Sequence, residues 1–189
     1  MSIIDKVVAA VTPPESDQAR IEARTKARAA AGGNDWLSLV LDHHERIEAA
    51  FAAVKSARDR TSRLAALKEL GVILTGHSTA EEASIYPALA RVDEKAHATE
   101  GYTEQAAAKL QMGLLENIAP MTQEFLDKLE HIRGAVAHHV YEEEGTWFLE
   151  LKEKMPAADQ ETLTQRYQEE FERYVGSDTG SPRRRAKAG

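Results

Sequence analysis

The sequence contains no cysteine, which excludes disulfide bonds, thiolate-bound iron–sulfur clusters and thiol-based catalysis. It also lacks any apolar run approaching the roughly 20 residues that a membrane-spanning helix needs. The first residues, MSIIDKVVAAVTPP, lack the basic start of a secretory signal, and Asp5 and Lys6 interrupt their apolar run. These absences predict a cytoplasmic protein with no membrane partner.

Positive charge is also scarce. The chain has 24 Lys and Arg against 31 Asp and Glu, a formal net charge of −7. This balance argues against a general nucleic-acid binder, so we expect no nucleic acid as a partner. Runs of β-branched residues are rare, whereas Ala, Glu, Lys, Arg and Leu are abundant. The composition therefore favours an all-α protein.

Apolar residues recur at helical spacing in four long segments, which predicts an up-down four-helix bundle over residues 34–155. The expected helices are about 35–58 with Asn34 as N-cap, about 62–90 with Thr61 as cap, about 94–117, and about 120–155 with Pro120 in the first turn. Pro87 should kink or end the second helix.

Three further segments flank this bundle. We expect an N-terminal helical extension (1–33), a C-terminal helix packed on or near the bundle (156–176) and a disordered basic tail (177–189). The extension divides into a short amphipathic helix over 2–11 and a charged, alanine-rich stretch over 15–31. That stretch is expected to form an exposed helix or a partner-binding arm.

One motif occurs twice: His77 is followed four residues later by Glu81, and His139 by Glu143. Residues four apart lie on the same face of an α-helix, so each copy offers an imidazole and a carboxylate to one point in space. Two such helices facing each other could build a metal site. In both copies an aromatic residue stands nine positions after the histidine, namely Tyr86 and Phe148.

Two other polar residues fall on apolar stripes, His44 in the first predicted helix and Gln105 in the third. Buried carboxylates are costly unless they are paired or bound to metal, and imidazole with carboxylate suits iron, manganese or zinc. A single histidine on such a stripe is more often a satisfied core residue, and a single His-x3-Glu pair is often a surface ion pair. The repetition favours a metal site, with a buried hydrogen-bond network as the alternative. The neighbours His43, Glu82, His138 and Glu144 are placed at the stripe edge or pointing away.

The motifs LDHHERIEAAF, HSTAEEASIYPAL and HHVYEEEGTWFL resemble those of the hemerythrin-like HHE cation-binding domains, over about residues 35–152. The resemblance implies a four-helix bundle that holds a non-haem, usually di-iron, centre. It implies as ligands His44, His77, Glu81, His139 and Glu143, with the two glutamates as bridges. The positions of Ile47, Phe51 and Phe148 assign the ligand roles to His44 and His139 rather than to His43 and His138.

The third predicted helix departs from the family pattern. Gln105 stands where the family has a histidine, and Gly101 stands where oxygen-carrying hemerythrins have another. Either the site holds one metal ion, or Tyr102 donates a phenolate, or Gln105, Glu104 or His97 contributes a ligand. The alternative for Tyr102 is a core aromatic hydrogen-bonded to the cluster. His97 is expected to be exposed and His131 to lie at the boundary.

Several functions follow from these residues. The first is a non-haem iron protein that binds or responds to oxygen, nitric oxide or peroxide, or that handles iron. With fewer histidines than an oxygen carrier, the site is poorly matched to reversible oxygen transport. The alternatives are a di-iron redox enzyme such as a peroxide-decomposing one, a structural bundle, and a non-redox zinc or manganese site. The terminal helices could also support a homodimer or bind a protein partner.

Overall fold

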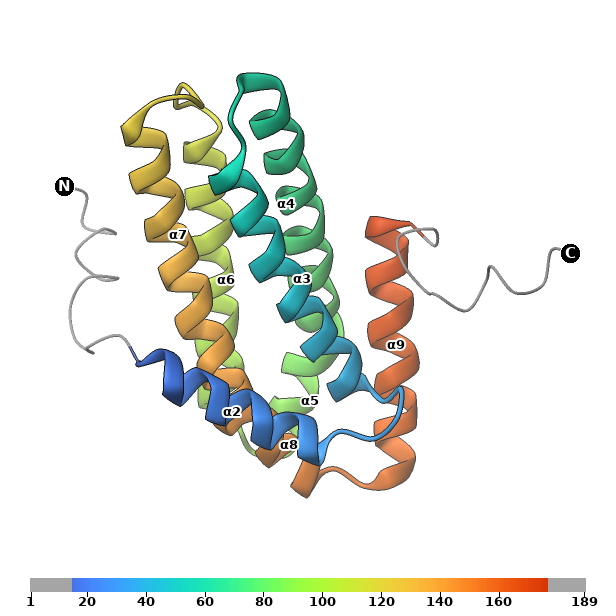
Figure 1. Cartoon of the computed structure of the whole chain (residues 1–189). Coiled ribbons are helices and arrows are strands. Elements are labelled where there is room, and N and C mark those ends of the chain that lie inside the picture. Colours follow the sequence, from blue (N-terminus) through green and yellow to red (C-terminus); the bar gives the residue numbers. More distant parts are fainter. Residues whose placement is uncertain (1–14, 177–189) are drawn as a thin grey trace, which may run out of the picture.

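The computed structural model describes residues 15–176, which form an all-α fold built around a four-helix bundle (Figure 1). This confirms the predicted fold class. The bundle comprises α3 (Trp36–Ser56), α4 (Arg60–Ala80) with η1 (Glu81–Ile85) and α5 (Tyr86–Arg91), α6 (Lys95–Leu115), and α7 (Gln123–Glu142) with η2 (Glu143–Trp147) and α8 (Phe148–Lys154). In the second and fourth helices a five-residue π-turn separates two α-helical parts.

The predicted helix starts were displaced by one to three residues. Asn34 has a positive φ of 65°, and the carboxylate of Asp35 caps α3 by accepting from the Ser38 amide. Asp59 caps α4 in place of Thr61, and Thr122 caps α7 two residues after Pro120. In each case a short polar side chain in extended backbone satisfies a free amide of the first turn.

Pro87 does not end the second helix. The chain leaves α4 through the π-turn η1 and continues into α5, where Pro87 stands in the first turn. A proline is tolerated there because its missing amide would have had no acceptor within a new α-helical segment.

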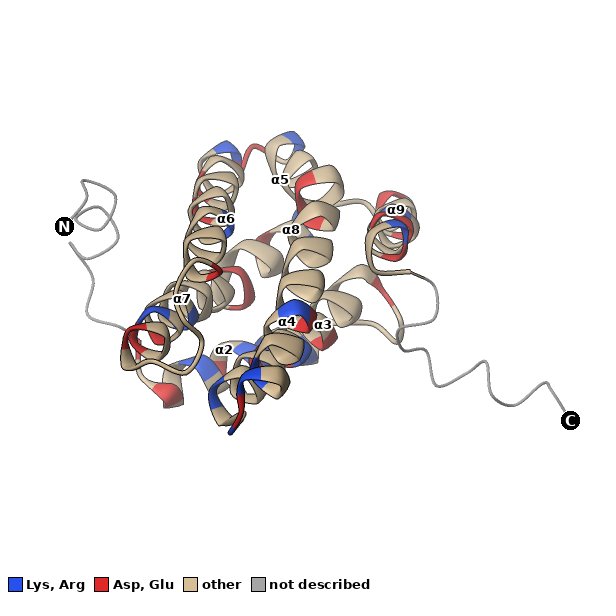
Figure 2. Ribbon diagram, turned by 90° about the horizontal axis from the view of Figure 1, so that it is seen from above, with Lys and Arg blue, Asp and Glu red and all other residues tan. Residues whose placement is uncertain are grey.

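Two more helices pack on the bundle. The stretch predicted as an exposed helix or arm forms α2 (Asp17–Ala30), which lies across α3 and η2 and buries Ala23 and Ala27. α9 (Ala157–Val175) lies along α4 and α3 and stands apart from α6 and α7 (Figure 2). The amphipathic segment predicted over 2–11 and the tail over 177–189 lie outside the described residues.

Large side chains fill the bundle at both ends, and Phe51 and Phe125 are buried at the end away from the motifs. Below the two His-x3-Glu motifs, large side chains such as Trp36, Tyr86 and Phe148 are fully buried. In the described residues no helix carries an apolar stretch long enough to pass through a membrane.

Candidate metal centre

The two His-x3-Glu motifs occupy matching places in the fold. His77 lies in the last turn of α4 and Glu81 opens η1, while His139 lies in the last turn of α7 and Glu143 opens η2. π-turns of this length within α-helices occur most often at functional sites. The internal repeat seen in the sequence is therefore also a repeat of backbone geometry.

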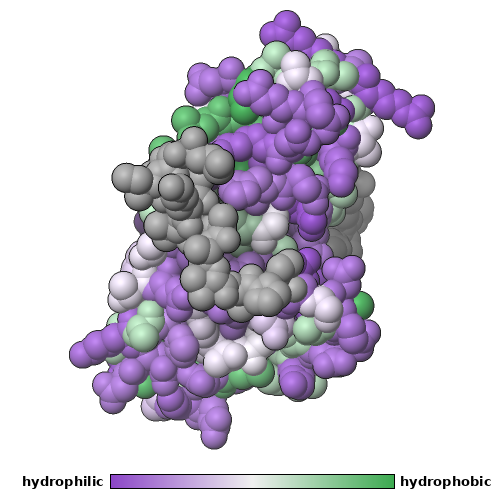
Figure 3. Space-filling view, turned by 90° about the vertical axis from the view of Figure 1, so that its left-hand side faces the viewer, coloured by the Kyte–Doolittle hydropathy of each residue, from purple (hydrophilic) through white to green (hydrophobic). Residues whose placement is uncertain are grey.

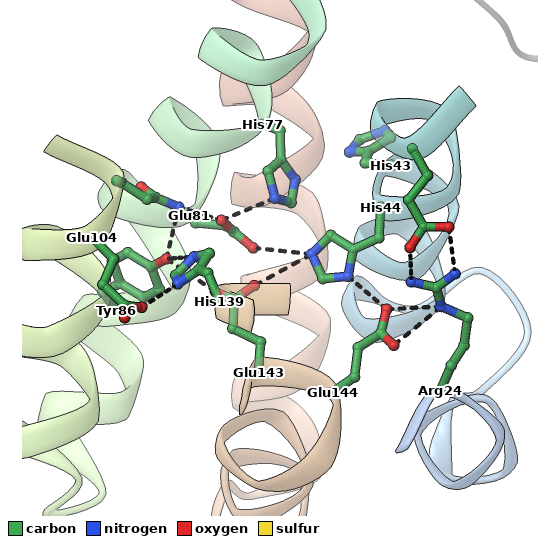
Figure 4. Close-up of polar contacts among 12 residues, drawn as sticks. Arg24, His43, His44, His77, Glu81, Tyr86, Glu104, His139, Glu143 and Glu144 are labelled. Carbon is green, nitrogen blue, oxygen red and sulfur yellow. Dashed lines mark hydrogen bonds and ion pairs between the residues drawn. The ribbon is translucent and has the colours of Figure 1, made fainter. Parts of the chain in front are cut away.

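Four predicted ligands converge on one point. His44, His77, Glu81 and Glu143 are buried, and each offers a nitrogen or oxygen atom within 4.8 Å of the others. His77 Nε2 lies 3.2 Å from Glu81 Oε2, and His44 Nε2 lies 3.3 Å from Glu143 Oε2 and 4.0 Å from Glu81 Oε1. The two motif helices and α3 thus meet at a single carboxylate-rich centre (Figure 4).

His139 joins the same centre through Glu143. Its Nε2 lies 3.3 Å from Glu143 Oε1, the oxygen that does not face His44. The two oxygens of Glu143 therefore point to histidines on different helices, which is the arrangement a bridging carboxylate needs. The structure brings all five predicted ligands together, while their roles as ligands stay predictions.

The residues fit a metal ion by a criterion independent of the sequence motif. His44 Nε2, Glu81 Oε1 and Glu143 Oε2 are buried and make no hydrogen bond of normal geometry with any residue in the described range 15–176. Leaving buried polar atoms unsatisfied costs about 1–3 kcal/mol each, and more for charged groups. Three such atoms aimed at one another are best satisfied by a shared cation.

Each of the three histidines is held from behind through its Nδ1. His44 Nδ1 lies 2.8 Å from Glu144 Oε1, His77 Nδ1 lies 3.1 Å from the Tyr167 hydroxyl, and His139 Nδ1 lies 2.8 Å from Glu104 Oε2. Outer partners of this kind fix the ring orientation and tautomer, so that Nε2 faces the metal.

Glu144 was predicted to point away from the site, and this was wrong. It is 1% exposed, contacts His44 and accepts from Arg24 Nε at 3.0 and 3.1 Å. Arg24 also donates to Glu48 at 2.6 Å. Helix α2 packs on η2 and covers Glu144, and Arg24 of α2 neutralises this carboxylate.

Tyr167 connects α9 to the same histidine layer. Its hydroxyl lies 3.1 Å from His77 Nδ1 and 2.7 Å from His43 Nδ1, and His43 stacks on Phe171 with ring centroids 3.7 Å apart. Burial and the nearby Arg46 lower the pKa of His43 to about 3. His43 is therefore a neutral residue of the outer shell.

The phenol at the centre belongs to Tyr86. Its hydroxyl donates to Glu143 Oε1 at 2.9 Å, lies 3.1 Å from His139 Nε2 and accepts from Gln105 Nε2 at 2.7 Å. Gln105 Nε2 also lies 2.6 Å from Glu81 Oε2. Tyr86 and Gln105 therefore occupy the side of the centre where the family pattern has histidines.

Tyr102 was predicted to face inward, and this was wrong. It is 40% exposed, and its hydroxyl donates to the Glu82 backbone carbonyl. Tyr86 was missed because nine residues at about 100° each place it roughly half a turn away from His77 on a regular helix. The π-turn inserts one extra residue and brings its side chain back toward the site. Its place nine positions after the histidine was the signal in the sequence.

Gly101 explains how the Tyr86 ring fits. A Cβ atom at residue 101 would lie 2.7 Å from Tyr86 Cζ and 2.9 Å from Cε1. The space that a histidine of the oxygen-carrier pattern would need is filled by the phenol ring.

The remaining candidates lie away from the centre. His97, predicted as exposed, is half-buried: it stacks on Trp147 and pairs with Glu94 and Glu150 at 3.5 and 3.4 Å. His138 pairs with Glu15 at 2.9 Å. His131 is exposed, and Glu82 pairs with Lys109 at 2.6 Å.

The charges of the metal-free centre follow from these contacts. Burial lowers the pKa of His44, but the nearby carboxylates of Glu143 and Glu144 outweigh it and raise this pKa to about 9. Burial likewise opposes ionisation of His139, yet Glu143 and Glu104 raise its pKa well above the ordinary value. Burial and the charge of Glu143 raise the pKa of Glu81, while the two cationic histidines overcome burial and lower that of Glu143.

Metal uptake at pH 7 is therefore expected to release protons, because His44 and His139 hold them in the metal-free protein. Affinity should rise with pH by up to about tenfold per pH unit for each proton displaced, and the contribution of His44 to this rise should end above about 9, where His44 no longer holds a proton. Calorimetric titration with zinc in two buffers of different ionisation enthalpy measures the released protons. Equal heats in both buffers would contradict this charge assignment.

Replacing Tyr86 with phenylalanine is expected to weaken metal binding by about 10- to 100-fold, the usual cost of losing an outer-shell hydrogen bond. The change leaves Gln105 and Glu143 each without one partner. Tyr102→Phe is the matched control and should leave affinity unchanged, because its hydroxyl bonds only to a backbone carbonyl at the surface. Competition against a chromophoric chelator measures both. If Tyr102→Phe weakened metal binding and Tyr86→Phe did not, the result would support Tyr102, and not Tyr86, as the phenol at the metal centre.

The helical bundle and its buried histidine–carboxylate centre define the class of metal-binding four-helix proteins. The hemerythrin HHE cation-binding domain family matches residues 37–151, and the chain belongs to this family. The match covers α3 to α8, so Arg24 of α2 and Tyr167 of α9 come from outside the matched region.

A DNA nickase from Nostoc sp. is 25% identical over 118 residues, which cover 62% of this chain and 34% of that protein. The chain thus spans about a third of the length of this relative. No solved structure matches the chain. The expectation that nucleic acid is not a partner finds no support in this relative and stays a prediction.

Proposed function

We propose that this protein is a non-haem iron protein whose centre binds or responds to oxygen, nitric oxide or peroxide. The observation that carries the proposal is the convergence of His44 Nε2, Glu81 Oε1 and Glu143 Oε2, buried and without hydrogen-bond partners among residues 15–176. A mixed imidazole and carboxylate set favours iron among the common biological metals, with zinc and manganese as the alternatives.

We infer two metal ions rather than one. His44 and His77 would hold the first together with Glu81 and Glu143, and His139 would hold the second with the same carboxylates. Support comes from Glu143, whose two oxygens face His44 and His139 at 3.3 Å each. Bound iron supplies the open coordination position and the electrons with which such small ligands react.

The chain's own residues set the properties of this centre. Arg24, through Glu144, and Tyr167 orient His44 and His77, while Glu104 orients His139. Tyr86 and Gln105 place a hydroxyl and an amide beside His139, where an oxygen carrier would have further imidazoles. This polar, histidine-poor side favours sensing, detoxification or iron handling over reversible oxygen transport.

Metal analysis of the purified protein, combined with its absorption spectrum before and after nitric oxide or hydrogen peroxide, tests the proposal. We expect about two irons per chain and a spectrum that either ligand changes. Zinc or manganese with no spectral response would favour the non-redox alternative. Rapid oxygen evolution from peroxide, lost in His77→Ala, would make the protein a peroxide-decomposing enzyme. Absence of metal, with melting unchanged by a chelator, would overturn the proposal.

Two expectations about partners remain. The net charge of −7 argues against nucleic acid as a partner. Because the relative that matches part of the chain is a DNA nickase, this expectation can be tested by incubating the protein with supercoiled plasmid and magnesium and looking for nicked DNA. A homodimer or a protein partner held through the terminal helices also stays a prediction. Ile21 on α2 and Tyr174 on α9 are exposed apolar side chains.

A further inference from the structure

A large cavity lies beside the metal centre, between α6 and α7, and reaches inward to α3 and α4. Its volume is about 1490 Å³. Small side chains create it, because α6 carries Ala106, Ala107 and Ala108 and α7 carries Gly134 and Ala135 where a tight bundle would have larger residues. Figure 3 views the molecule from the left-hand side of Figure 1. Where the undescribed residues do not hide this face, patches of hydrophobic and neutral residues lie between hydrophilic ones.

The cavity opens directly onto the centre. His77, Gln105 and His139 belong to its wall. Residues on the cavity side keep some exposure in the middle of the bundle, such as His139 at 7% and Val136 at 8%, whereas Phe148 below the centre is at 0%. The histidines on the cavity side are therefore slightly exposed, whereas His44, Glu81 and Glu143 are fully buried.

One further buried polar atom lies in a residue of the cavity wall and has no hydrogen-bond partner among the described residues. Gln105 is 5% exposed, and its Nε2 donates hydrogen bonds to Glu81 Oε2 and to the Tyr86 hydroxyl. Its carbonyl oxygen Oε1 is buried and has no hydrogen-bond partner within residues 15–176. This amide orientation places Nε2 at 2.6 Å from Glu81 Oε2 and at 2.7 Å from the Tyr86 hydroxyl. Gln105 is part of the cavity wall, and Oε1 is its polar atom without a partner among the described residues.

The size of the cavity indicates its ligand. A diatomic molecule or peroxide needs a space on the order of one water, about 30 Å³, whereas pockets for organic ligands span roughly 300–1,000 Å³ and are mostly apolar with few polar groups. The rim carries both acidic and basic side chains, among them Glu130, Arg133 and Lys95. Because charges of both signs line the rim, it does not favour a ligand whose outer end is either positively or negatively charged.

We infer that this cavity binds an elongated aliphatic molecule that ends in an O–H donor, a medium-chain alcohol or alkyl hydroperoxide. The chain lies along the alanine-rich wall of α6, and the terminal O–H donates to Gln105 Oε1. Binding of the alcohol needs no metal. The hydroperoxide source rests on the proposed function, because its O–O bond would then stand beside His77 and the metal.

Displacement of the apolar fluorophore N-phenyl-1-naphthylamine from the full chain tests this, with and without a chelator present. We expect 1-decanol to displace the probe in both conditions. 1-Methoxydecane, which has the same chain and no donor, should bind about five- to tenfold more weakly, the worth of one hydrogen bond. Equal affinity for the two would overturn the role of Gln105.

Filling the cavity provides the matched variants. Ala108→Phe on α6 and Val136→Phe on α7 should each weaken decanol binding at least tenfold, and Ala49→Leu on the exposed side of α3 should not. Two variants on opposite walls keep the test valid if one of them fails to fold. Unchanged decanol binding in a folded filling variant would overturn the proposal.

Two further outcomes separate the sources of the ligand. With ascorbate added as the electron donor, faster reduction of decyl hydroperoxide to decanol and water than of hydrogen peroxide to water by the iron-loaded protein assigns the hydroperoxide, provided that Ala108→Phe loses this difference at unchanged iron content. Decanol binding without any peroxide turnover keeps the cavity and removes the peroxide part of the proposed function. If deleting residues 2–11 raises probe binding while decanol fails to compete, the cavity serves that apolar segment, and the inference is overturned.

Discussion

Replacing His44 with alanine is expected to abolish stoichiometric metal binding, with a loss of affinity greater than about 100-fold. The cost exceeds the 10- to 100-fold typical of an outer-shell change because His44 Nε2 faces both carboxylates of the centre. The metal-free variant should also lose about 1–3 kcal/mol in free energy of unfolding, since Glu143 and Glu144 each lose one buried partner, while His139 still faces Glu143 and Arg24 still binds Glu144. Elemental analysis after gel filtration and chemical denaturation measure the two effects.

His43→Ala is the matched control, one residue away on the same helix. His43 contacts Tyr167 and Phe171 instead of the carboxylates, so its removal should lower stability by about 1–3 kcal/mol and keep most of the metal. His131→Ala, at an exposed position, should change neither quantity. Loss of metal in His43→Ala together with its retention in His44→Ala would show that the ligand register is wrong.

Gly101→Ala is expected to destabilise the protein by about 1–3 kcal/mol, although the same change usually stabilises a helix by roughly 0.5–1 kcal/mol. The added methyl would stand 2.7 Å from Tyr86 Cζ, and this ring is fully buried. The ring has to move away from Glu143 and Gln105, so metal affinity should fall as well. Thermal or urea denaturation and chelator competition measure both effects.

The control for Gly101→Ala lies on the same helix. A Cβ at Gly113 meets nothing within 4 Å, so Gly113→Ala should be stabilising by about 0.5–1 kcal/mol. Combining Gly101→Ala with Tyr86→Ala removes the steric conflict, and the double variant should be more stable than the sum of the single changes predicts. Simple additivity would mean that the Tyr86 ring does not fill this space.

The helical faces could be predicted because they depend on local periodicity. A spacing of four residues places His77 with Glu81 and His139 with Glu143 in any α-helix. The apolar neighbours of His44 likewise distinguish it from His43, and the structure places these two histidines in the centre and behind it. The ligand roles themselves stay predictions.

Helix ends were less predictable than faces. Asn34 and Asp35 are both good capping residues, and so are Thr61 and Asp59. The choice between them depends on where the preceding loop leaves the bundle. Only packed neighbours decide this, as when the Trp36 amide finds the hydroxyl of Thr164 on α9.

The sequence by itself determined the all-α bundle, the repeated histidine–glutamate pairs and the absence of two carrier histidines at Gln105 and Gly101. Only the tertiary structure shows that the Tyr86 ring fills the space that these histidines would occupy. The π-turn η1 shifts the register of the residues that follow it, which turns Tyr86 inward against the α-helical period, and the packing of α2 on η2 buries Glu144. Arg24 and Tyr167 reach the centre from helices more than a hundred and about ninety residues from their partners. No local pattern encodes such contacts, because they depend on how separate helices pack.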